Sequence, residues 1–568
     1  MRALALAILL ACLLPQPAAA FEFDVPFTQE LEASFEITHT LLLDYHDDNL
    51  DGLEGNDGYF DLRNRLNLRL AIDAFTVSAR LDTATFFSEP AFSPEDDSRP
   101  GGWTPYLGRY GIEKVAGAWQ GRHVQVSLGD FYASFGRGLA LRIQKVDQIS
   151  EDTSLLGAKV AARLGPVELI GLSGLTNPTN ADGITEKTVE DTYDLVSGLR
   201  AVWRVVPQVA LAVHGVHLLM DPLDENENAA RQFGQFFMPD RAWLAGASLE
   251  LPDLWSHGDA YLEFDWLDRR FKTDLDRSDG WAVYAGGNIF LGDLTLTAEA
   301  KAYRAYELFG LSDDADDHLA LRLDYIRPPT LEPEEMEIEN NHDITGARLQ
   351  LDWRPGGGDW LVFASYAGFV ALESRPTLSD GRRWIYNTNL GLELDFWRRG
   401  RARVRAGLRE SVPLYSGPVS TQLIYLDASL ELPLAAQHAV SLKATHWFVH
   451  EHHPTARLSP NADTIRGDLV LDWSFSPWLS VGLILGWNTT PSGARKLDVF
   501  HTTLDTRTDL QIVERQLYMA GSVSANLYDW VTLRVLGGQL RGGPLCVNGV
   551  CRILPPFAGL RFEAVVRL

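Results

Sequence analysis

The sequence predicts an all-β protein, a single transmembrane antiparallel β-barrel of about 24 strands, within a range of about 22–26. Three observations predict this fold: an N-terminal export signal, a period-two alternation of apolar and polar residues along the remaining chain, and a strict alternation of short and long connections. We divide the chain into a signal peptide, residues 1–20, and an outer-membrane β-barrel, residues 21–568.

The export signal has a charged start at Arg2, an apolar run over residues 3–14 and a small-residue cleavage site at 18–20. The apolar run is too short to cross a bilayer as a helix, so we expect cleavage before Phe21. The alternative is lipidation at Cys12, because the residues before it resemble a lipobox. Both alternatives take the chain out of the cytoplasm.

The composition restricts the class of protein. After residue 21 no stretch approaches the ~20 apolar residues of a transmembrane helix, which excludes a helical membrane protein. The chain carries 16 Trp, 17 Tyr, 26 Phe and 48 Gly, which suits many strands joined by glycine-marked turns. The formal net charge of −26 is concentrated in predicted loops and argues against nucleic acid as a partner. We expect Cys546 and Cys551 to form a disulfide in an oxidising compartment.

Period-two alternation is clearest in residues 63–73, 347–353, 389–396 and 401–409. In the last of these, Ala402, Val404, Ala406 and Leu408 alternate with arginines and a glycine. A soluble β-sandwich also alternates, so the connection lengths decide between the two folds.

Eleven short connections alternate with twelve long ones, which gives about 24 strands with both termini on the short-turn side, as in outer-membrane barrels. The short connections lie near 73–74, 120–122, 165–166, 206–207, 252–256, 292–293, 355–358, 399–400, 433–436, 476–477 and 528–529. The long ones lie near 44–58, 88–108, 132–154, 175–192, 220–239, 269–279, 309–341, 373–382, 413–420, 452–463, 490–512 and 542–554.

Tryptophans lie close to the short connections, where indole rings suit the membrane interface. The final strand, 559–568, alternates apolar residues outward and ends in Leu568, where outer-membrane proteins usually end in an aromatic residue. We expect outer-membrane lipid and the barrel-assembly machinery as partners. The tryptophans are Trp119, Trp203, Trp255, Trp353, Trp360, Trp397, Trp473, Trp478 and Trp530.

One segment departs from the pattern. Alternation runs to Gly129, residues 130–138 intervene, and Leu139, Leu141 and Ile143 then resume it. Two full traversals here would invert the side of every later loop, so we interpret 123–147 as one traversal with a deviating insert. The glycines of the insert allow it to bend into the lumen.

The residues 129–141, GDFYASFGRGLAL, followed by Lys145 and Gly157-Ala158-Lys159, resemble the signature of an uncharacterised family of large bacterial outer-membrane proteins. Residues 56–59 and 64–68 resemble the first hairpin of that family. The resemblance covers mainly 56–178. It implies an outer-membrane barrel and supplies no substrate or catalytic residues.

Charged residues of the lumen are the candidate pore residues. Arg137 lies between two glycines of the insert and either selects anionic solutes at a constriction or bridges to a lumen carboxylate, and Arg142 follows in the same segment. A second set on adjoining strands either forms a transverse field or closes into salt bridges. It comprises Arg401, Arg403, Arg405, Arg409, Glu393 and Asp395.

Two patterns suggest metal ligands. Asp47, Asn49 and Asp51 follow the first half of a calcium loop, but Gly58 stands where the bidentate glutamate is required, so weakly bound calcium and a solvated acidic loop remain the alternatives. Imidazoles crowd the rim at 446–453, without a defined ligand geometry.

We expect no enzyme, because no catalytic motif occurs in a credible context. The leading hypothesis is a passive or substrate-selective channel for an unidentified polar solute, narrowed by inward loops. The second is a non-conducting barrel whose acidic, disulfide-clipped external loops bind an envelope or surface partner. A membrane-embedded hydrolase is the third. About ten residues between Phe21 and the first strand are too few for a plug domain, which argues against energy-coupled uptake.

Overall fold

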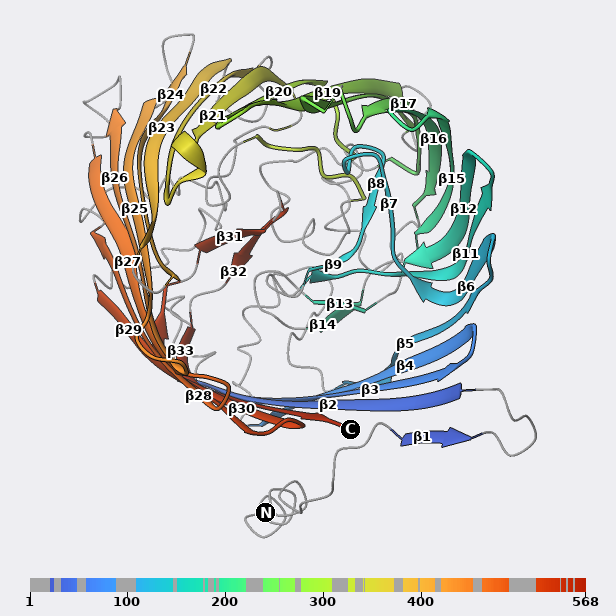
Figure 1. Ribbon diagram of the computed structural model, residues 1–568. Coiled ribbons are helices and arrows are strands. Elements are labelled where there is room, and N and C mark those ends of the chain that lie inside the picture. Colours follow the sequence, from blue (N-terminus) through green and yellow to red (C-terminus); the bar gives the residue numbers. More distant parts are fainter. Residues whose placement is uncertain are drawn as a thin grey trace, which may run out of the picture.

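The wall of the protein is a closed barrel of 24 antiparallel strands, which confirms the predicted fold class (Figure 1). A further short strand, β1 (Phe21–Asp24), pairs with the start of β2. The computed structural model describes residues 21–24, 32–47, 58–87, 109–146, 151–176, 179–181, 188–190, 194–220, 239–254, 256–270, 277–308, 325–331, 341, 343–371, 382–396, 399–413, 420–452, 462–489, 517–541, 543–547, 550–554 and 557–568.

The wall strands are 8–15 residues long. In chain order they are β2 (Glu32–His46), β3 (Tyr59–Ile72), β4 (Phe75–Phe87), β5 (Arg109–Gln120), β6 (Val124–Phe131), β11 (Leu155–Leu164), β12 (Val167–Thr176), β15 (Leu195–Val206), β16 (Val209–Leu219), β17 (Arg241–Leu251), β18 (Gly258–Arg270), β19 (Arg277–Leu291), β20 (Leu294–Arg304), β21 (Ile344–Trp353), β22 (Trp360–Ala371), β23 (Arg383–Phe396), β24 (Gly400–Pro413), β25 (Ser420–Pro433), β26 (His438–His452), β27 (Ala462–Phe475), β28 (Leu479–Thr489), β29 (Leu517–Tyr528), β30 (Val531–Leu540) and β33 (Phe557–Arg567).

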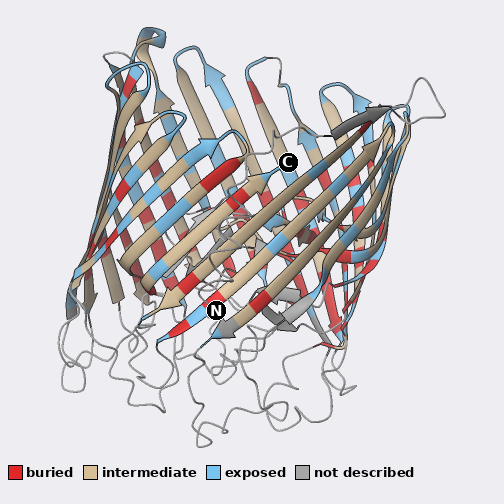
Figure 2. Ribbon diagram, turned by 90° about the horizontal axis from the view of Figure 1, so that it is seen from below, coloured by how far each residue is buried: buried red, intermediate tan, exposed pale blue. Residues whose placement is uncertain are grey.

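The ring closes between β2 and β33, which pair antiparallel from Thr38↔Arg567 to His46↔Gly559. Strands run obliquely around the wall, with short turns at one end (Figure 2). All eleven predicted short connections are turns between consecutive wall strands. At three of them a residue with positive φ, Asp73, Gly165 or Gly292, forms the tight reversal that a two-residue hairpin requires.

The two faces of the wall differ as the alternation predicts. Register places Leu349 beside Tyr366 and Leu351 beside Ala364, and Leu349, Leu351 and Tyr366 are among the exposed apolar side chains of the outer face. Trp353 and Trp360 stack edge to face at 5.6 Å beside the short turn that contains the 3-10 helix η6 (Pro355–Gly357). Within the described residues no helix is long and apolar enough to cross a membrane.

Four short ribbons lie apart from the wall sheet, each a pair of antiparallel strands. Figure 1 shows all of them inside the outline of the ring. They are β7 (Ala133–Phe135) with β8 (Leu141–Ile143), β9 (Lys145–Val146) with β10 (Glu151–Asp152), β13 (Thr179–Ala181) with β14 (Thr188–Glu190), and β31 (Gly543–Val547) with β32 (Val550–Leu554).

The traversal that we predicted over 123–147 ends earlier. Wall strand β6 stops at Phe131, and β11 pairs with it directly from Leu155↔Phe131 to Ala162↔Val124. The alternating Leu139, Leu141 and Ile143 are therefore not wall residues. The strand count is unaffected, because the whole insert leaves and returns on one side of the barrel.

Candidate functional site

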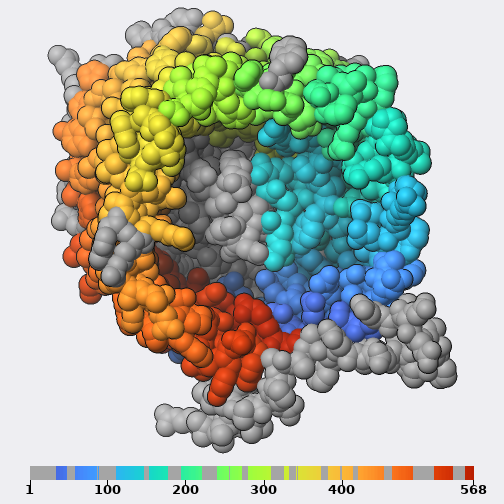
Figure 3. All heavy atoms as spheres, viewed as in Figure 1, coloured from blue at the N-terminus to red at the C-terminus, as the bar shows by residue number. Residues whose placement is uncertain are grey.

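The lumen holds a hydrophobic core built around the insert, which we define as residues 132–154. The hairpin β7–β8 pairs Ala133 with Ile143 and Phe135 with Leu141, and it turns through Gly136 and Gly138, both with positive φ. Leu139 and Leu141 are completely buried. Atoms of this part of the chain occupy one side of the barrel interior (Figure 3). The bend into the lumen that the glycines suggested is confirmed.

The wall is shaped to receive the insert. A Cβ at Gly198 of β15 would lie 2.8 Å from the ring of Phe135, so this glycine leaves the space that the phenyl group fills. The buried cluster around the hairpin includes inward-facing residues from β15 to β23. Examples are Val196, Val216, Leu218, Leu244, Leu267, Ala282, Tyr303, Ile344, Phe369 and Ile385.

A second segment, residues 325–331, lies against the insert, and we call it the strap. The amide of Arg142 donates to the carbonyl of Tyr325 at 2.8 Å, and the amide of Arg327 donates to the carbonyl of Gly138 at 2.8 Å. Ile326 and Leu331 join the same buried cluster. The prediction that 309–341 is simply an external loop is wrong for these residues, because their backbone hydrogen bonds are made inside the barrel.

Side chains of β20 hold the strap to the wall. Lys301 Nζ donates to the carbonyl of Thr330 at 2.7 Å and to Asn341 Oδ1 at 2.6 Å. The hydroxyl of Tyr303 donates to the carbonyl of Pro329 at 3.1 Å. Just beyond β20, the hydroxyl of Tyr306 donates to the carbonyl of Leu139 at 3.0 Å. Strap, insert and wall are thus one hydrogen-bonded unit.

The returning end of the insert is anchored by charge. Asp152 forms ion pairs with Arg80 and Lys114 and accepts a hydrogen bond from the hydroxyl of Tyr132 at 2.6 Å. Burial alone would raise the pKa of Asp152, but Lys114, Tyr132 and Arg80 outweigh it and hold the pKa below the ordinary 3.8. Burial also raises the pKa of Tyr132, which keeps its phenol a donor.

The two arginines predicted in the insert have different settings. Arg137 is exposed at the turn, its guanidinium carbon 4.6 Å from the ring centroid of Tyr261, and its amide donates to Glu263 Oε2 at 2.8 Å. The contact with the lumen carboxylate Glu263 is thus made by the backbone amide of Arg137, whereas its guanidinium lies over the ring of Tyr261. Arg142 is half-buried where the strap meets the insert.

The predicted charged ladders face each other across β23 and β24, with Asp395 opposite Arg401 and Glu393 opposite Arg403. Arg401 Nε lies 3.1 Å from Asp395 Oδ1 and 3.5 Å from Glu393 Oε1. Arg354, from the turn beside them, reaches both carboxylates at 3.6–3.9 Å. These residues form a salt-bridge network along the wall.

Two further ladder arginines, Arg403 and Arg405, contact an aromatic ring or a carboxylate. Arg405 Nε donates to Asp427 Oδ2 at 2.8 Å. The Arg403 guanidinium lies 4.8 Å from the Phe363 ring centroid, and Arg409 is buried.

Several inward ion pairs remain in contact with water. Arg401 is 53% exposed and Arg534, paired with Glu563, is also 53% exposed. Arg69 and Glu36, on β3 and β2, are paired at 3.2 Å and about half exposed. On the described part of the lumen face these pairs lie on β2, β3, the end of β23, β24, β30 and β33, whereas the buried cluster around the insert and the strap extends from β6 to the start of β23. The described lumen face therefore has a packed apolar side and a solvent-exposed charged side.

Other predicted site residues lie partly outside the described part of the chain. Asp47 accepts a hydrogen bond from the Tyr45 hydroxyl at 3.1 Å, whereas Asn49 and Asp51 are outside the described residues. Register places Cys546 opposite Cys551 in the β31–β32 ribbon, so the disulfide stays a prediction with a suitable backbone. At the rim, His450 contacts Asp463.

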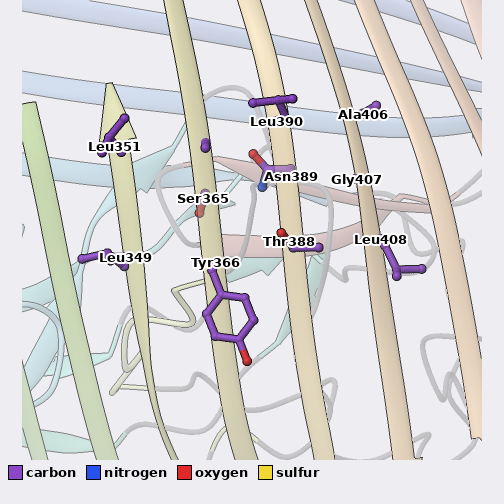
Figure 4. Close-up of a pocket in the computed structure, with 11 residues that line it drawn as sticks. Leu349, Leu351, Ser365, Tyr366, Thr388, Asn389, Leu390, Ala406, Gly407 and Leu408 are labelled. Atoms are coloured by element: carbon purple, nitrogen blue, oxygen red, sulfur yellow. The ribbon is translucent and has the colours of Figure 1, made fainter. Parts of the chain in front are cut away.

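A shallow groove of about 590 Å³ lies on β21–β24 (Figure 4). Small side chains such as Ala364 and Ala406 leave it open between the larger Leu349, Tyr366 and Leu390. These larger side chains belong to the exposed apolar outer face. The groove is therefore a feature of the outer surface and not of the lumen.

Comparison with known proteins finds a family model that matches the N-terminal third of the chain, and solved structures with a similar fold. Residues 1–187 match the model of a "Family of unknown function (DUF6029)", which includes the segment on which the resemblance at 129–141 rests. No curated protein matches the chain.

Solved structures to which the chain is similar include two receptors and a porin. The siderophore receptor PirA from Pseudomonas aeruginosa is 10% identical, with 94% of this chain and 80% of that chain covered and a TM-score of 0.45. A mutant of the ferric enterobactin receptor of the same organism is 11% identical, with the same coverage and a TM-score of 0.47. A BenF-like porin from Pseudomonas fluorescens Pf-5 is 10% identical, with 68% of this chain and 94% of that chain covered and a TM-score of 0.36.

Proposed function

We propose that this protein is an outer-membrane channel for small polar solutes, narrowed on one side by the insert and the strap. The observation that carries the proposal is the asymmetry of the lumen. Arg401, Asp395 and Glu393 lie in a solvent-exposed charged network where β23 ends and β24 begins, while the insert and the strap share a buried cluster that runs from β6 to Ile385 near the start of β23. Fixed charges beside water are the elements by which pores select ions and polar solutes.

The same wall supports a location in the outer membrane. A closed barrel leaves no unpaired strand edge, and an apolar outer face with polar residues inside suits a lipid surround. Trp119, Trp203 and Trp478 are exposed near the short turns, where indoles anchor a barrel at the membrane interface. Outer-membrane lipid and the barrel-assembly machinery are the partners that this location implies.

Arg137 is the proposed constriction residue. Its backbone amide donates to Glu263 and its guanidinium lies over the Tyr261 ring, and both contacts favour an exposed cation at the tip of the insert. A cation held there favours the passage of anions over cations.

Recording from purified protein in planar bilayers tests the channel. We expect discrete conductance steps, a smaller preference for anions in Arg137→Ala, and a shift in ion preference in Arg401→Gln. Arg122→Gln is the matched control, because Arg122 is exposed in the turn between β5 and β6 and its loss removes the same charge.

A wild-type barrel that shows the heat-dependent gel shift of a folded outer-membrane protein and yet carries no current would contradict the channel. That result would favour the non-conducting barrel whose external loops bind a partner. Equal effects of the Arg122 and Arg401 substitutions would remove the wall network from the proposal.

A further inference from the structure

Three ionisable side chains meet on the lumen face of the wall, beneath the turn of the insert. His214 Nε2 lies 2.6 Å from Asp265 Oδ1 and 3.9 Å from Glu263 Oε1, and all three side chains are 0% exposed. One potential ligand atom from each residue lies within 4.8 Å of the others. We call these residues the buried triad.

The strands are built to bring the triad together. Register aligns His214 of β16 with Gly246 of β17, and Gly246 with Asp265 of β18. A Cβ at Gly246 would lie 2.1 Å from Asp265 Oδ1 and 2.5 Å from His214 Nε2. The glycine on the middle strand therefore leaves the gap across which imidazole and carboxylate meet.

The carboxyl groups of the triad lack a lysine or arginine partner. Among the described residues, the ion-pair partner of both Glu263 and Asp265 is His214, and no lysine or arginine pairs with either carboxylate. The two carboxyl groups are therefore held in a site closed to solvent without a lysine or arginine beside them. Buried carboxyl groups in proteins are usually paired with a cation or coordinate a metal.

Two oxygen atoms of the triad also lack hydrogen-bond partners. Glu263 Oε2 accepts from the Tyr261 hydroxyl at 2.7 Å and from the Arg137 amide at 2.8 Å. Glu263 Oε1, which faces His214, and Asp265 Oδ2 are buried and have none. Buried polar atoms are rarely left in this state, and a bound ion is one established reason for it.

We propose that the buried triad binds one divalent transition-metal ion of the Zn²⁺ class. One imidazole nitrogen and two carboxylate oxygens form a donor set that such ions accept. Ligands about 2.1 Å from a tetrahedral ion lie roughly 3.4 Å apart, between the observed 2.6 and 3.9 Å. Binding of the ion would therefore lengthen the distance from His214 Nε2 to Asp265 Oδ1 and shorten the distance from His214 Nε2 to Glu263 Oε1, each by less than about 1 Å.

The ion would fix the insert as well as the wall. Glu263 offers Oε1 to the ion while Oε2 holds the amide of Arg137, so metal binding sets the position of the turn through a single carboxylate. An ion held there would fix the turn whether or not the barrel conducts.

A second cluster of two aspartates and a histidine has the arginine partners that the buried triad lacks. Asp44, His46 and Asp61 also approach one another near the rim. There Arg561 binds Asp44 through two hydrogen bonds of 2.9 Å, and Arg63 binds Asp61 at 2.6 Å. Arginines supply the cations at this cluster, so we assign no metal to it and use it as the control.

Metal content tests the proposal. Detergent-solubilised wild-type protein is stripped with a chelator, reloaded with Zn²⁺ or Co²⁺, and analysed by mass spectrometry and by the visible absorption of Co²⁺. We expect one tightly held equivalent in the wild type and in His46→Ala, and its loss in His214→Ala and Asp265→Asn. The heat-dependent gel shift reports whether each variant is folded.

Two further readouts separate binding from a merely structural triad. Tyr261→Phe removes a donor that orients Glu263 and should weaken Zn²⁺ affinity about 10–100-fold. Hydrogen exchange at the Arg137 amide should slow when Zn²⁺ is added. A folded wild-type protein that takes up no Zn²⁺ or Co²⁺, or a His214→Ala variant that retains the ion, would overturn the proposal.

Discussion

The backbone amide of Arg142 donates a hydrogen bond to the carbonyl of Tyr325, which joins two segments that connect to different strands of the wall. Arg142 follows β6, and Tyr325 precedes β21. Each segment has a backbone amide whose hydrogen-bond acceptor is a carbonyl of the other segment. We therefore expect changes in one to be measurable in the other.

Gly136→Ala should release the turn of the insert without unfolding the wall. The position has a φ of +64°, and a Cβ there would lie 1.5 Å from Glu263 Oε1. The control is Gly165→Ala, because Gly165 has a φ of +60° with no atom within 4 Å. Both variants carry roughly 1–2 kcal/mol of left-handed strain, and only the first adds a collision. Faster proteolysis within the insert of Gly136→Ala alone is the expected result, and equal proteolysis of both would contradict it.

Leu141→Ala should weaken the docking of the insert by about 2–5 kcal/mol, because it opens a cavity in a completely buried site. Leu390→Ala is the control, since Leu390 lies on the outer face and is 60% exposed. Hydrogen exchange of residues 139–143 is the measurement. If exchange there is unchanged in Leu141→Ala, the apolar contacts do not hold the insert.

Acidification should loosen the returning end of the insert. The pKa of Asp152 is held below 3.8 in the folded protein, so its ion pairs stabilise the fold at higher pH and that contribution is lost as the pH falls through the folded value. Asp152→Asn should remove this pH dependence and destabilise the insert by about 3–5 kcal/mol, because Lys114 is left without its carboxylate, whereas Arg80 keeps its ion pair with Asp82. Hydrogen exchange of the insert, followed as the pH is lowered from neutrality, measures both. A wild-type profile that stays flat to the most acidic pH tested would contradict the expectation.

Cys546 and Cys551 should be oxidised in protein isolated from the cell envelope. Their α-carbons are register partners, and closing a loop of this size stabilises the local ribbon by about 2 kcal/mol. Thiol labelling of denatured protein should rise by two groups after reduction, and the barrel should keep its heat-dependent gel shift. Two thiols that react without reductant would rule out the disulfide.

Much of the wall could be predicted from the sequence, because the short connections are visible in it and the side chains of each strand alternate between an apolar outer face and a polar lumen face. The destination of Leu139, Leu141 and Ile143 could not be predicted. A ribbon with one buried face has the same period whether it packs in the wall or inside it, so only the glycines before it indicated a departure.

The strap and the buried triad gave weaker signals. Residues 325–331 show no alternation of apolar and polar residues. They also contain Pro328 and Pro329, which lack the amide that a strand ladder uses. His214 is 51 residues from Asp265, and their meeting depends on the register of β16, β17 and β18. Neither spacing nor composition encodes a register across three strands.

The seam of the barrel has a consequence for biogenesis. Asp44 and Arg561, which bind across it, are separated by 517 residues, so the last strand must be synthesised before the ring can be sealed. The described contacts of the insert and the strap with the wall, by contrast, are made by strands between β4 and β23, for example by Arg80 and Lys114 with Asp152. These contacts can therefore form while the sheet is still open, and the pairing of β33 with β2 then closes the ring around an interior that is already packed.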